Sequence, residues 1–210
     1  MLDTVKRLKS DPDVSSRVNN QLKRFASFKN LSNDEWFSEL CFCLLTSNSK
    51  AMTAMKIQEA LGTHGFMHHT TETIRETIIA NKHRFHNVKT NYIVSAREHL
   101  RIKDILMPLV DEGGSSAARE WLVANIKGFS YKESSHFLRN VGFFDLAILD
   151  RHILNLMLEH GVMDEKPATL NRKRYLMIEE TFRGLSDELG ISCAELDFYM
   201  WYMRTGQVLK

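Results

Sequence analysis

The sequence predicts an all-α protein, and three observations carry that prediction. Apolar residues recur along almost the whole chain at the three- and four-residue spacing of an amphipathic helix. No stretch shows the sustained alternation of apolar and polar residues that marks a strand. Only 3 prolines interrupt 210 residues, and 10 methionines favour helices. We therefore expect about ten helices joined by short connections.

The first expected helix runs from Pro12 to about Lys29. Asp11 is a suitable N-cap, and proline is well tolerated at the first helical position. The apolar residues of this helix are Val14, Val18, Leu22 and Phe25. They fall at helical spacing, so we expect them to form one apolar face.

A second helix is expected from Ser32 or Asn33, and a third from about Ser49 to Leu61. The inward positions of the second are Trp36, Phe37, Leu40, Cys41, Leu44 and Leu45. We interpret this apolar stripe as core. Gly62 follows the third helix directly and is expected to end it as a C-cap.

The remaining helices are expected at 71–81, 87–100, 103–112, 116–126, 132–141, 150–160, 170–189 and 192–204. Two glycines at 113–114 are expected to separate the helices at 103–112 and 116–126. Gly161 and Pro167 are expected to separate the helices at 150–160 and 170–189. No internal repeat, low-complexity tract or flexible linker marks a domain boundary. The length is compatible with one domain or two small ones.

Composition excludes several classes of protein. Hydrophobic residues make up 43% and charged residues 26%, which excludes wholesale disorder. No run approaches the ~18 apolar residues of a spanning helix. The charged N-terminal stretch lacks the apolar segment of a signal peptide, so we expect no export. Three cysteines form neither a disulfide framework nor a CxxC pair, which indicates a reducing compartment. The net charge of +2 is compatible with nucleic-acid binding without arguing for it.

Residues 126–140 are the first of three places that could carry chemistry. A helix ends at Gly128, a tight turn follows, and a new helix begins. Glycine tolerates the positive φ that such a turn requires. Backbone N–H groups at the start of the new helix would bind an anion such as a DNA phosphate. The alternative is an ordinary turn between two helices.

The second place is 145–155, where Asp150 directly precedes an apolar helical pattern. An aspartate there is often only an N-cap. The same position also holds a carboxylate rigid and ionised. The third place is 197–210, which is rich in aromatic residues and ends on Lys210. Its alternative interpretation is an amphipathic terminal helix with a frayed tail.

The spacing of these places resembles a known superfamily. Gly128 is followed four residues later by Lys132, and Asp150 comes 18 residues after that lysine. This pattern resembles the helix-hairpin-helix Gly/Pro…Asp superfamily of DNA glycosylases. Within it, the chain is most similar to the archaeal-type 8-oxoguanine DNA glycosylases, the second Ogg class. The similarity is carried by residues 44–51, 84–93, 140–154 and 201–210.

Two departures from the superfamily pattern are visible. Ser130 stands at the third hairpin position, where glycine is usual, and this could loosen the turn or its phosphate contact. The cysteines that hold an iron–sulfur cluster in the endonuclease III branch are absent, so no cluster and no other cofactor is expected. Five histidines (His64, His68, His69, His83 and His86) match no closed zinc ligand set, and no metal is expected.

The resemblance implies two helical domains with the active cleft between them. Residues 31–142 would form the central domain with the hairpin, and 1–30 plus 143–210 the second. It further implies that Lys132 attacks C1′ of the damaged nucleotide, displaces the base and forms a Schiff base, after which β-elimination nicks the strand. The attacking amine must be neutral, which favours a desolvated or cationic setting. Asp150 would stabilise the developing positive charge on the sugar.

The resemblance also implies a pocket for a base flipped out of the duplex. Phe85 and Trp201 would sandwich the purine, although each is also a plausible core aromatic. The α-carboxylate of Lys210 would accept a hydrogen bond from N7–H of 8-oxoguanine, which guanine lacks. Asp197, one turn before Trp201, is a further candidate for base recognition. Asn48 would fill the gap left by the flipped base; alternatively it caps the helix from Ser49.

Contacts with DNA are expected from Asn48, Gly128, Ser130 and Arg84. Arg84 belongs to a small basic patch at 82–89 that surrounds Phe85. The expected partner is double-stranded DNA that contains 8-oxoguanine, with no membrane, for a monomer in a prokaryotic cytoplasm near the nucleoid. Two alternatives stay open: a glycosylase for another damaged base, and a non-catalytic hairpin-type DNA-binding module.

Overall fold

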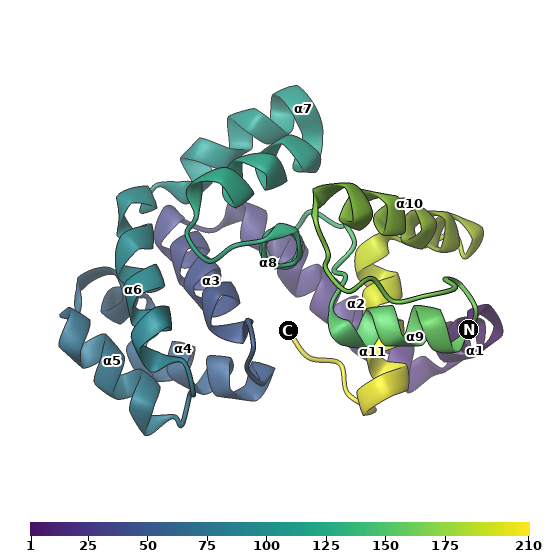
Figure 1. The fold of residues 1–210 in the computed structure, drawn as a ribbon, viewed down its shortest axis with the longest axis horizontal. Coiled ribbons are helices and arrows are strands. Elements are labelled where there is room, and N and C mark those ends of the chain that lie inside the picture. The colour runs from purple at the N-terminus through teal and green to yellow at the C-terminus, as the bar shows by residue number, and fades with distance from the viewer. The chain divides into compact units, whose positions relative to one another are not determined.

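The computed structural model describes all 210 residues, and its regular elements are all helices. The all-α prediction is confirmed. The α-helices are α1 (Leu2–Ser10), α2 (Pro12–Ser27), α3 (Asn33–Thr46), α4 (Ala51–His68), α5 (Thr71–Ala80), α6 (His86–Ala96), α7 (Ile102–Asn125), α8 (Tyr131–Asn140), α9 (Arg151–Glu159), α10 (Arg172–Glu188) and α11 (Cys193–Thr205) (Figure 1). Two short 3-10 helices are η1 (Phe28–Asn30) and η2 (Arg97–His99).

The chain divides into two compact units. Residues 28–137 form one, which we call the central unit. Residues 1–27 and 138–210 form the other, which we call the terminal unit. The division falls inside α8, so this helix contributes its first turns to the central unit and its last residues to the terminal unit.

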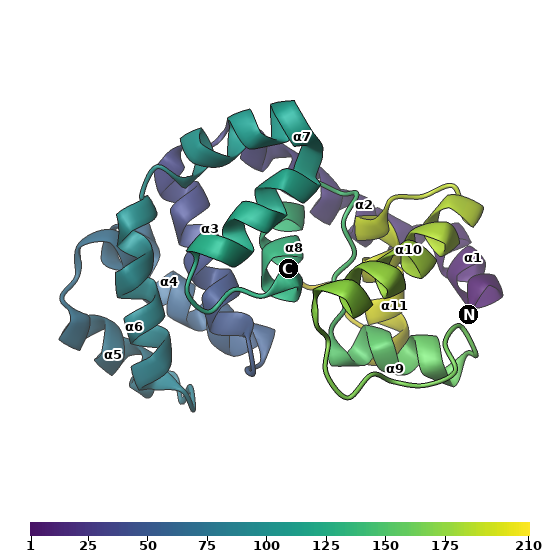
Figure 2. The same ribbon diagram turned by 45° about the horizontal axis from the view of Figure 1, so that its top comes forward.

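The central unit is built around α3. A capping box starts this helix: the hydroxyl of Ser32 accepts from the N–H of Glu35, and the Glu35 carboxylate accepts from the N–H of Ser32. From Trp36 to Thr46 every residue of α3 is buried, as expected for a helix that is apolar on all sides. It contacts α4, α6 and α7, and Figure 1 and Figure 2 show it running through the middle of the unit. The predicted core stripe is confirmed.

The terminal unit is built around α11, which contacts α1, α2, α9 and α10. The rings of Phe25 and Phe198 stack with centroids 6.0 Å apart. Beside them Arg139 of α8 donates to the carboxylate of Asp197 at 2.5 Å, and its guanidinium lies 4.8 Å from the centre of the Phe198 ring. Both charged residues are buried, so this ion pair belongs to the core of the unit.

The structure differs from the expected elements at three points. Helix α1 precedes the first helix expected from the sequence. Gly62 and Gly114 do leave the helical conformation, with φ of +58° and +70°, but helical turns resume at once, so α4 and α7 each run on through a kink. The glycine changes the direction of the helix at the kink, and helical turns resume because the flanking residues retain their helical preference.

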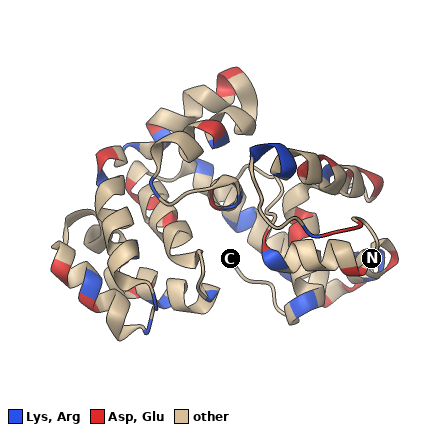
Figure 3. Ribbon diagram, viewed as in Figure 1, with Lys and Arg blue, Asp and Glu red and all other residues tan.

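Basic and acidic residues occur in both units, as Figure 3 shows, in keeping with 28 basic and 26 acidic residues in the chain. No helix is at once long enough and apolar enough to cross a membrane.

Candidate active site

The hairpin between α7 and α8 depends on Gly128. Its φ is +94°, a conformation that residues with a Cβ rarely adopt. A Cβ on Gly128 would also lie 2.3 Å from Cδ2 of Tyr92. The Tyr92 ring of α6 therefore packs directly against the backbone of the turn, and glycine is required both for its conformation and for space.

The first turn of α8 presents Lys132 next to a buried carboxylate. Oε2 of Glu133 accepts from the backbone N–H of Ser130 at 3.3 Å and also from the Ser130 hydroxyl. Oε1 of Glu133 lies 3.4 Å from Nζ of Lys132. The Lys132 side chain is 22% exposed and that of Glu133 only 10%. The Lys132 side chain is thus accessible to solvent. Its amine contacts one oxygen of the Glu133 carboxylate, while Ser130 holds the other oxygen.

The pKa of Glu133 reflects this position. Burial alone would raise the pKa, but the charge of Lys132, the Ser130 hydroxyl and the N–H groups of Glu133 and Ser130 outweigh burial and lower it. Ser130, which replaces the usual third hairpin glycine, therefore has a structural role in the hairpin. Its hydroxyl and N–H fix the carboxylate that faces Lys132.

Lys89 of α6 is a second amine in this neighbourhood, and the sequence analysis missed its burial. The residue is 4% exposed, and its Nζ lies 5.8 Å from the centre of the Tyr92 ring. Burial lowers its pKa to about 8, with Glu133 opposing and Lys132 adding to that effect. Lys89 shares its face of α6 with the buried Ile93 and Ala96. This i, i+4, i+7 spacing is the signal that could have placed it inside.

Asp150 is the N-cap of α9. Oδ1 accepts from the backbone N–H of His152 at 2.8 Å and of Ile153 at 2.9 Å. Oδ2 accepts no hydrogen bond within the protein. The cap interpretation is therefore correct, and it leaves one oxygen of an oriented carboxylate available.

The Trp201 indole in α11 is half-buried and meets the edge of the His152 ring, with centroids 5.1 Å apart and planes at 90°. Its buried N–H has no hydrogen-bond partner in the protein. His152 is two residues from Asp150, so one turn of α9 both presents the carboxylate and contacts the tryptophan.

The C-terminal tail leaves α11 at Gly206, whose φ of +68° forms the left-handed C-cap. Residues 207–210 follow without regular structure (Figure 1). They run beside α2, where a cavity of about 500 Å³ is lined by Arg17, Asn20, Gln21, Arg24, Gly206, Gln207, Val208 and Leu209. Lys210 itself is half-buried.

Comparison with known proteins agrees with this geometry. A family model described as 8-oxoguanine DNA glycosylase matches residues 18–191. The chain belongs to this glycosylase family. A Methanocaldococcus jannaschii protein named 8-oxoguanine DNA glycosylase/AP lyase is 45% identical over 210 residues, which cover 100% of this chain and 99% of that protein.

Solved structures of family members share the fold. The crystal structure of the M. jannaschii glycosylase/lyase with a 15mer DNA containing 8-oxoguanine has a TM-score of 0.95 at 44% identity, covering 100% of this chain and 99% of that one. The Thermotoga maritima 8-oxoguanine DNA glycosylase has a TM-score of 0.91 at 36% identity, covering 100% and 98%. The helix-hairpin-helix glycosylase fold predicted from the sequence is confirmed.

Among the other residues that the family resemblance singled out, Phe85 sits at the start of α6. Its N–H donates to Nδ1 of His83 at 3.2 Å, and Nε2 of His83 lies 2.9 Å from the carbonyl oxygen of Leu45 in α3. The guanidinium of Arg84 lies 4.7 Å from the centre of the Phe85 ring. His83 is buried, and burial lowers its pKa, so the ring is a neutral bridge that positions the Phe85 loop.

The structure changes the interpretation of the basic patch at 82–89. His83 and Lys89 are both buried, whereas Arg84 is exposed. The His83 ring reaches the carbonyl oxygen of Leu45 in α3, a contact that lies outside the segment. Only part of the patch can therefore reach a phosphate.

Asn48 and Asp197 have clear local roles. Asn48 is exposed between α3 and α4 with φ of +59°, a conformation that asparagine tolerates better than most residues. It does not cap α4, because Lys50 occupies the N-cap position. Asp197 is 6% exposed, and its carboxylate accepts from Arg139.

The candidate residues divide between the two units. The central unit holds Asn48, Arg84, Phe85, Gly128, Ser130 and Lys132, and the terminal unit holds Asp150, Asp197, Trp201 and Lys210. The residues that sequence reasoning missed are His83, Lys89, Tyr92, Glu133 and His152. Four of these contact a candidate residue or its backbone (His83, Tyr92, Glu133 and His152), and Lys89 lies beside the Tyr92 ring.

Proposed function

We propose that this chain is a bifunctional 8-oxoguanine DNA glycosylase/AP lyase that acts on double-stranded DNA. The observation that carries the proposal is the lysine at the start of the hairpin helix, solvent-accessible and next to a single carboxylate. A pure DNA-binding hairpin needs no nucleophilic amine at that position. The names of relatives that are 41–45% identical over the full chain support the same activity.

Lys132 supplies the nucleophile in this proposal. Its neutral Nζ attacks C1′ of the damaged nucleotide, the N–C1′ bond forms, and the glycosidic bond to the base breaks. The new N–C1′ group loses a proton, the nitrogen lone pair then breaks the C1′–O4′ bond, and O4′ takes up a proton, so that the opened sugar carries an iminium, the Schiff base. Removal of a C2′ proton then expels the 3′ phosphate and nicks the strand by β-elimination. Glu133 holds the amine in place beforehand through the contact at 3.4 Å.

Asp150 supplies negative charge. Its Oδ1 is fixed by two backbone N–H groups of α9, which orients the carboxylate without any reorganisation during the reaction. Its Oδ2 is available to stabilise the oxocarbenium-like charge on the sugar.

The base would be recognised by Phe85, Trp201 and the carboxylate of Lys210. Aromatic stacking on a flipped base contributes ~1–3 kcal/mol. Phe85 has one guanidinium near its ring, and Trp201 carries an indole N–H without a protein partner, which leaves a donor for a ligand or a water. Asp197 receives no role here, because Arg139 engages its carboxylate in the core.

DNA contacts would come from Asn48, Arg84, Gly128 and Ser130. We further propose that 31–142 and 1–30 plus 143–210 act as the two domains of a monomer that works on the DNA of a prokaryotic nucleoid. The small net charge of +2 supplies little general attraction to DNA, so we expect binding to depend on local contacts.

A single-turnover assay tests the function. The protein is incubated with a duplex that contains one 8-oxoguanine, and base release and strand nicking are followed separately. We expect both products, and neither from the same duplex with guanine. Parallel duplexes with an oxidised pyrimidine or an alkylated purine distinguish a glycosylase for another lesion. Binding without release from any duplex would instead indicate a non-catalytic DNA-binding module and refute the proposal.

A further inference from the structure

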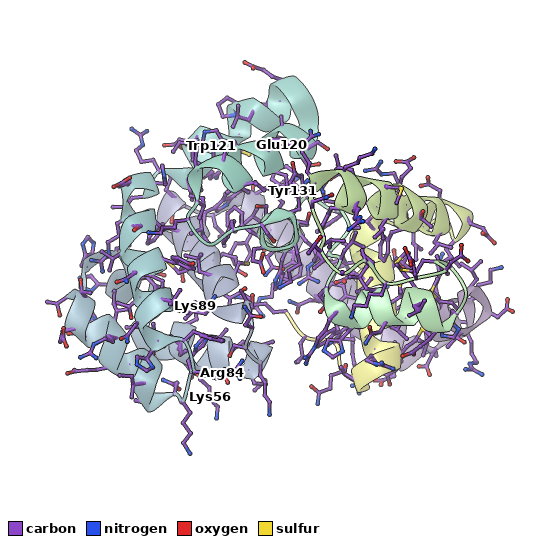
Figure 4. The ribbon with its side chains drawn as sticks, in the orientation of Figure 1. Lys56, Arg84, Lys89, Glu120, Trp121 and Tyr131 are labelled. Atoms are coloured by element: carbon purple, nitrogen blue, oxygen red, sulfur yellow. The ribbon has the colours of Figure 1, made fainter.

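The DNA contacts described so far come from one unit. Asn48, Arg84, Gly128 and Ser130 all belong to the central unit, and Figure 4 shows Arg84 among the side chains of that unit. The terminal unit supplies residues for the chemistry and for the base, but none for a DNA phosphate. Phosphate contacts set the register of a protein on its duplex. A phosphate contact is therefore expected close to the residues of the terminal unit that bind the base.

One face of α2 is a candidate for that contact. Arg17, Asn20, Gln21 and Arg24 follow one another at helical spacing, so their side chains project from the same side of α2. All four line the cavity of about 500 Å³ whose remaining lining is residues 206–209 of the tail. We call this cavity the α2–tail groove. Its helical side consists of polar and positively charged side chains alone.

The α2–tail groove carries positive charge and no carboxylate. None of its lining residues is acidic, and the stretch 14–33 contains four basic residues and no acidic one. Arg17 is paired with Asp13 at 2.8 Å. Arg24 is exposed and makes no ion pair within the protein. One guanidinium in the groove is therefore available to an anion.

Gln21 adds a hydrogen-bond donor that the protein leaves unused. Its Nε2 is buried and donates to no group of the protein. A buried polar group without a partner destabilises the fold, so a ligand that accepts from it gains affinity. Arg24 lies three residues further on the same face. A guanidinium can donate two parallel hydrogen bonds to phosphate oxygens, and a neutral amide can donate one more.

The groove lies close to the residue proposed to bind the base. Leu209 is part of its lining and directly precedes Lys210, whose carboxylate is proposed to accept from N7–H of 8-oxoguanine. The four residues from Gly206 to Leu209 span at most about 14 Å when extended. Charges along one DNA strand repeat every ~3.4 Å of the helix axis. A strand whose base reaches Lys210 therefore has backbone phosphates within reach of the groove.

We propose that the α2–tail groove binds a phosphate of the DNA backbone near the lesion, with Arg24 as the charged contact and Gln21 as a neutral donor. Arg17 contributes less, because Asp13 already neutralises it. The proposal rests on the function proposed above. The contact fixes the lesion strand relative to the tail that recognises the base.

The test measures equilibrium binding of a duplex that contains a tetrahydrofuran abasic-site analogue, which has no base to release and cannot form an imine. Affinity is measured between about 50 and 200 mM salt, because each phosphate contact contributes about −0.9 to the slope of log K against log salt. We expect Arg24→Gln to lose one such contribution. Its affinity relative to wild type should therefore rise about 3.5-fold over that range. Arg24→Lys retains the charge and should keep the wild-type slope.

Three further variants separate charge from hydrogen bonding. Gln21→Leu keeps every charge, so we expect roughly three- to tenfold weaker binding with the wild-type salt slope. Asp13→Asn releases Arg17 and should tighten binding and steepen the slope. Lys23→Gln is the matched control, because Lys23 is exposed on α2 next to Arg24 but does not line the groove. We expect its slope to stay close to that of wild type.

Equal salt slopes for Arg24→Gln and wild type would overturn the proposal. The same reduction of the slope in Lys23→Gln, or an unchanged affinity of Gln21→Leu, would overturn it as well. Thermal unfolding in chloride establishes that the variants are folded.

Free phosphate is distinguished from DNA by thermal unfolding in inorganic phosphate and in chloride of equal ionic strength. A stabilisation by phosphate that Arg24→Gln lacks, with equal slopes for DNA, would assign the groove to free phosphate and overturn the DNA contact. A wild-type protein that binds the duplexes but releases no 8-oxoguanine would refute the proposed function alone, because the salt slopes still decide the role of the groove.

Discussion

At the scale of single residues, Asp150 shows how one carboxylate serves structure and chemistry together. Oδ1 satisfies two N–H groups at the start of α9, and Oδ2 stays unpaired within the protein. Either task alone would explain an aspartate at this position. Substitution by asparagine separates them, because the amide oxygen can still cap while the charge is lost.

We expect Asp150→Asn to unfold at nearly the wild-type temperature and to release 8-oxoguanine roughly 10²–10³-fold more slowly, the size of loss typical when one electrostatic stabiliser is removed. Differential scanning calorimetry and single-turnover kinetics measure the two effects. Near-normal turnover with an unchanged Tm would mean that Asp150 is only a helix cap.

The lowered pKa of Lys89 predicts that the stability of the fold depends on pH. Its pKa in the folded protein is about 8, below the ordinary 10.5, so between these values the unfolded chain binds more protons than the folded one. The free energy of unfolding therefore increases as pH rises from 8 to 10.5, because the unfolded chain loses its extra proton over this range. Below pH 8 the buried ammonium lowers the free energy of unfolding by its full amount.

Lys89→Met should consequently be more stable than wild type at pH 7, by up to about 3 kcal/mol, with the difference shrinking towards pH 10.5. Urea denaturation at pH 7 and pH 10 measures this difference. Tyr199, whose pKa burial and Glu195 raise to about 12, titrates in both proteins and cancels in the comparison. Equal destabilisation at both pH values would show that the Lys89 ammonium is well accommodated in the folded state.

At the scale of elements, the hairpin between α7 and α8 depends on Gly128, which packs against the ring of Tyr92. Gly128→Ala introduces a Cβ 2.3 Å from Cδ2 of Tyr92 and imposes a φ of +94° on a residue that disfavours it. We expect a loss of at least about 2 kcal/mol in the free energy of unfolding. Gly184→Ala in α10 is the control, since nothing lies within 4 Å of its Cβ and alanine favours a helix. The idea fails if chemical denaturation finds both variants equally stable.

The tail after α11 is the second element with a testable role. Removal of Lys210, or extension of the chain beyond it, moves the carboxylate proposed to accept from N7–H of 8-oxoguanine. We expect a reduced preference for 8-oxoguanine over guanine, while Lys132-dependent nicking of a plain abasic duplex continues. Competition between the 8-oxoguanine duplex and the matched guanine duplex measures the preference. Unchanged excision of 8-oxoguanine after extension would remove the tail from the recognition of the base.

At the scale of the whole molecule, the features that sequence could predict are the local ones. Asp11 with Pro12, and Ser32 with Glu35, mark helix starts through interactions within a few residues, and α2 and α3 begin there. The break at Gly114 was predictable for the same reason. The helix that follows the break was predicted as well, because apolar residues of 116–126 recur at helical spacing, and α7 continues to Asn125.

Features that depend on distant contacts escaped the sequence analysis. His83 is buried because its ring reaches Leu45 in α3, and Asp197 pairs with an arginine 58 residues away. Lys89 is buried on α6 beside Tyr92, whose ring packs against Gly128 of the hairpin. The spacing of Lys132 and Asp150 is a local pattern and could be predicted, whereas the side chains that support these two residues could not.

The amine that forms the Schiff base is open to direct observation. The full-length protein is incubated with an 8-oxoguanine duplex in the presence of borohydride, and the covalent adduct is digested and mapped by mass spectrometry. We expect the DNA remnant on Lys132, and no adduct and no base release from Lys132→Gln, which should still bind the lesion duplex. An adduct on Lys89 or another residue, or trapping by Lys132→Gln at the wild-type level, would contradict the assignment of Lys132 as the nucleophile.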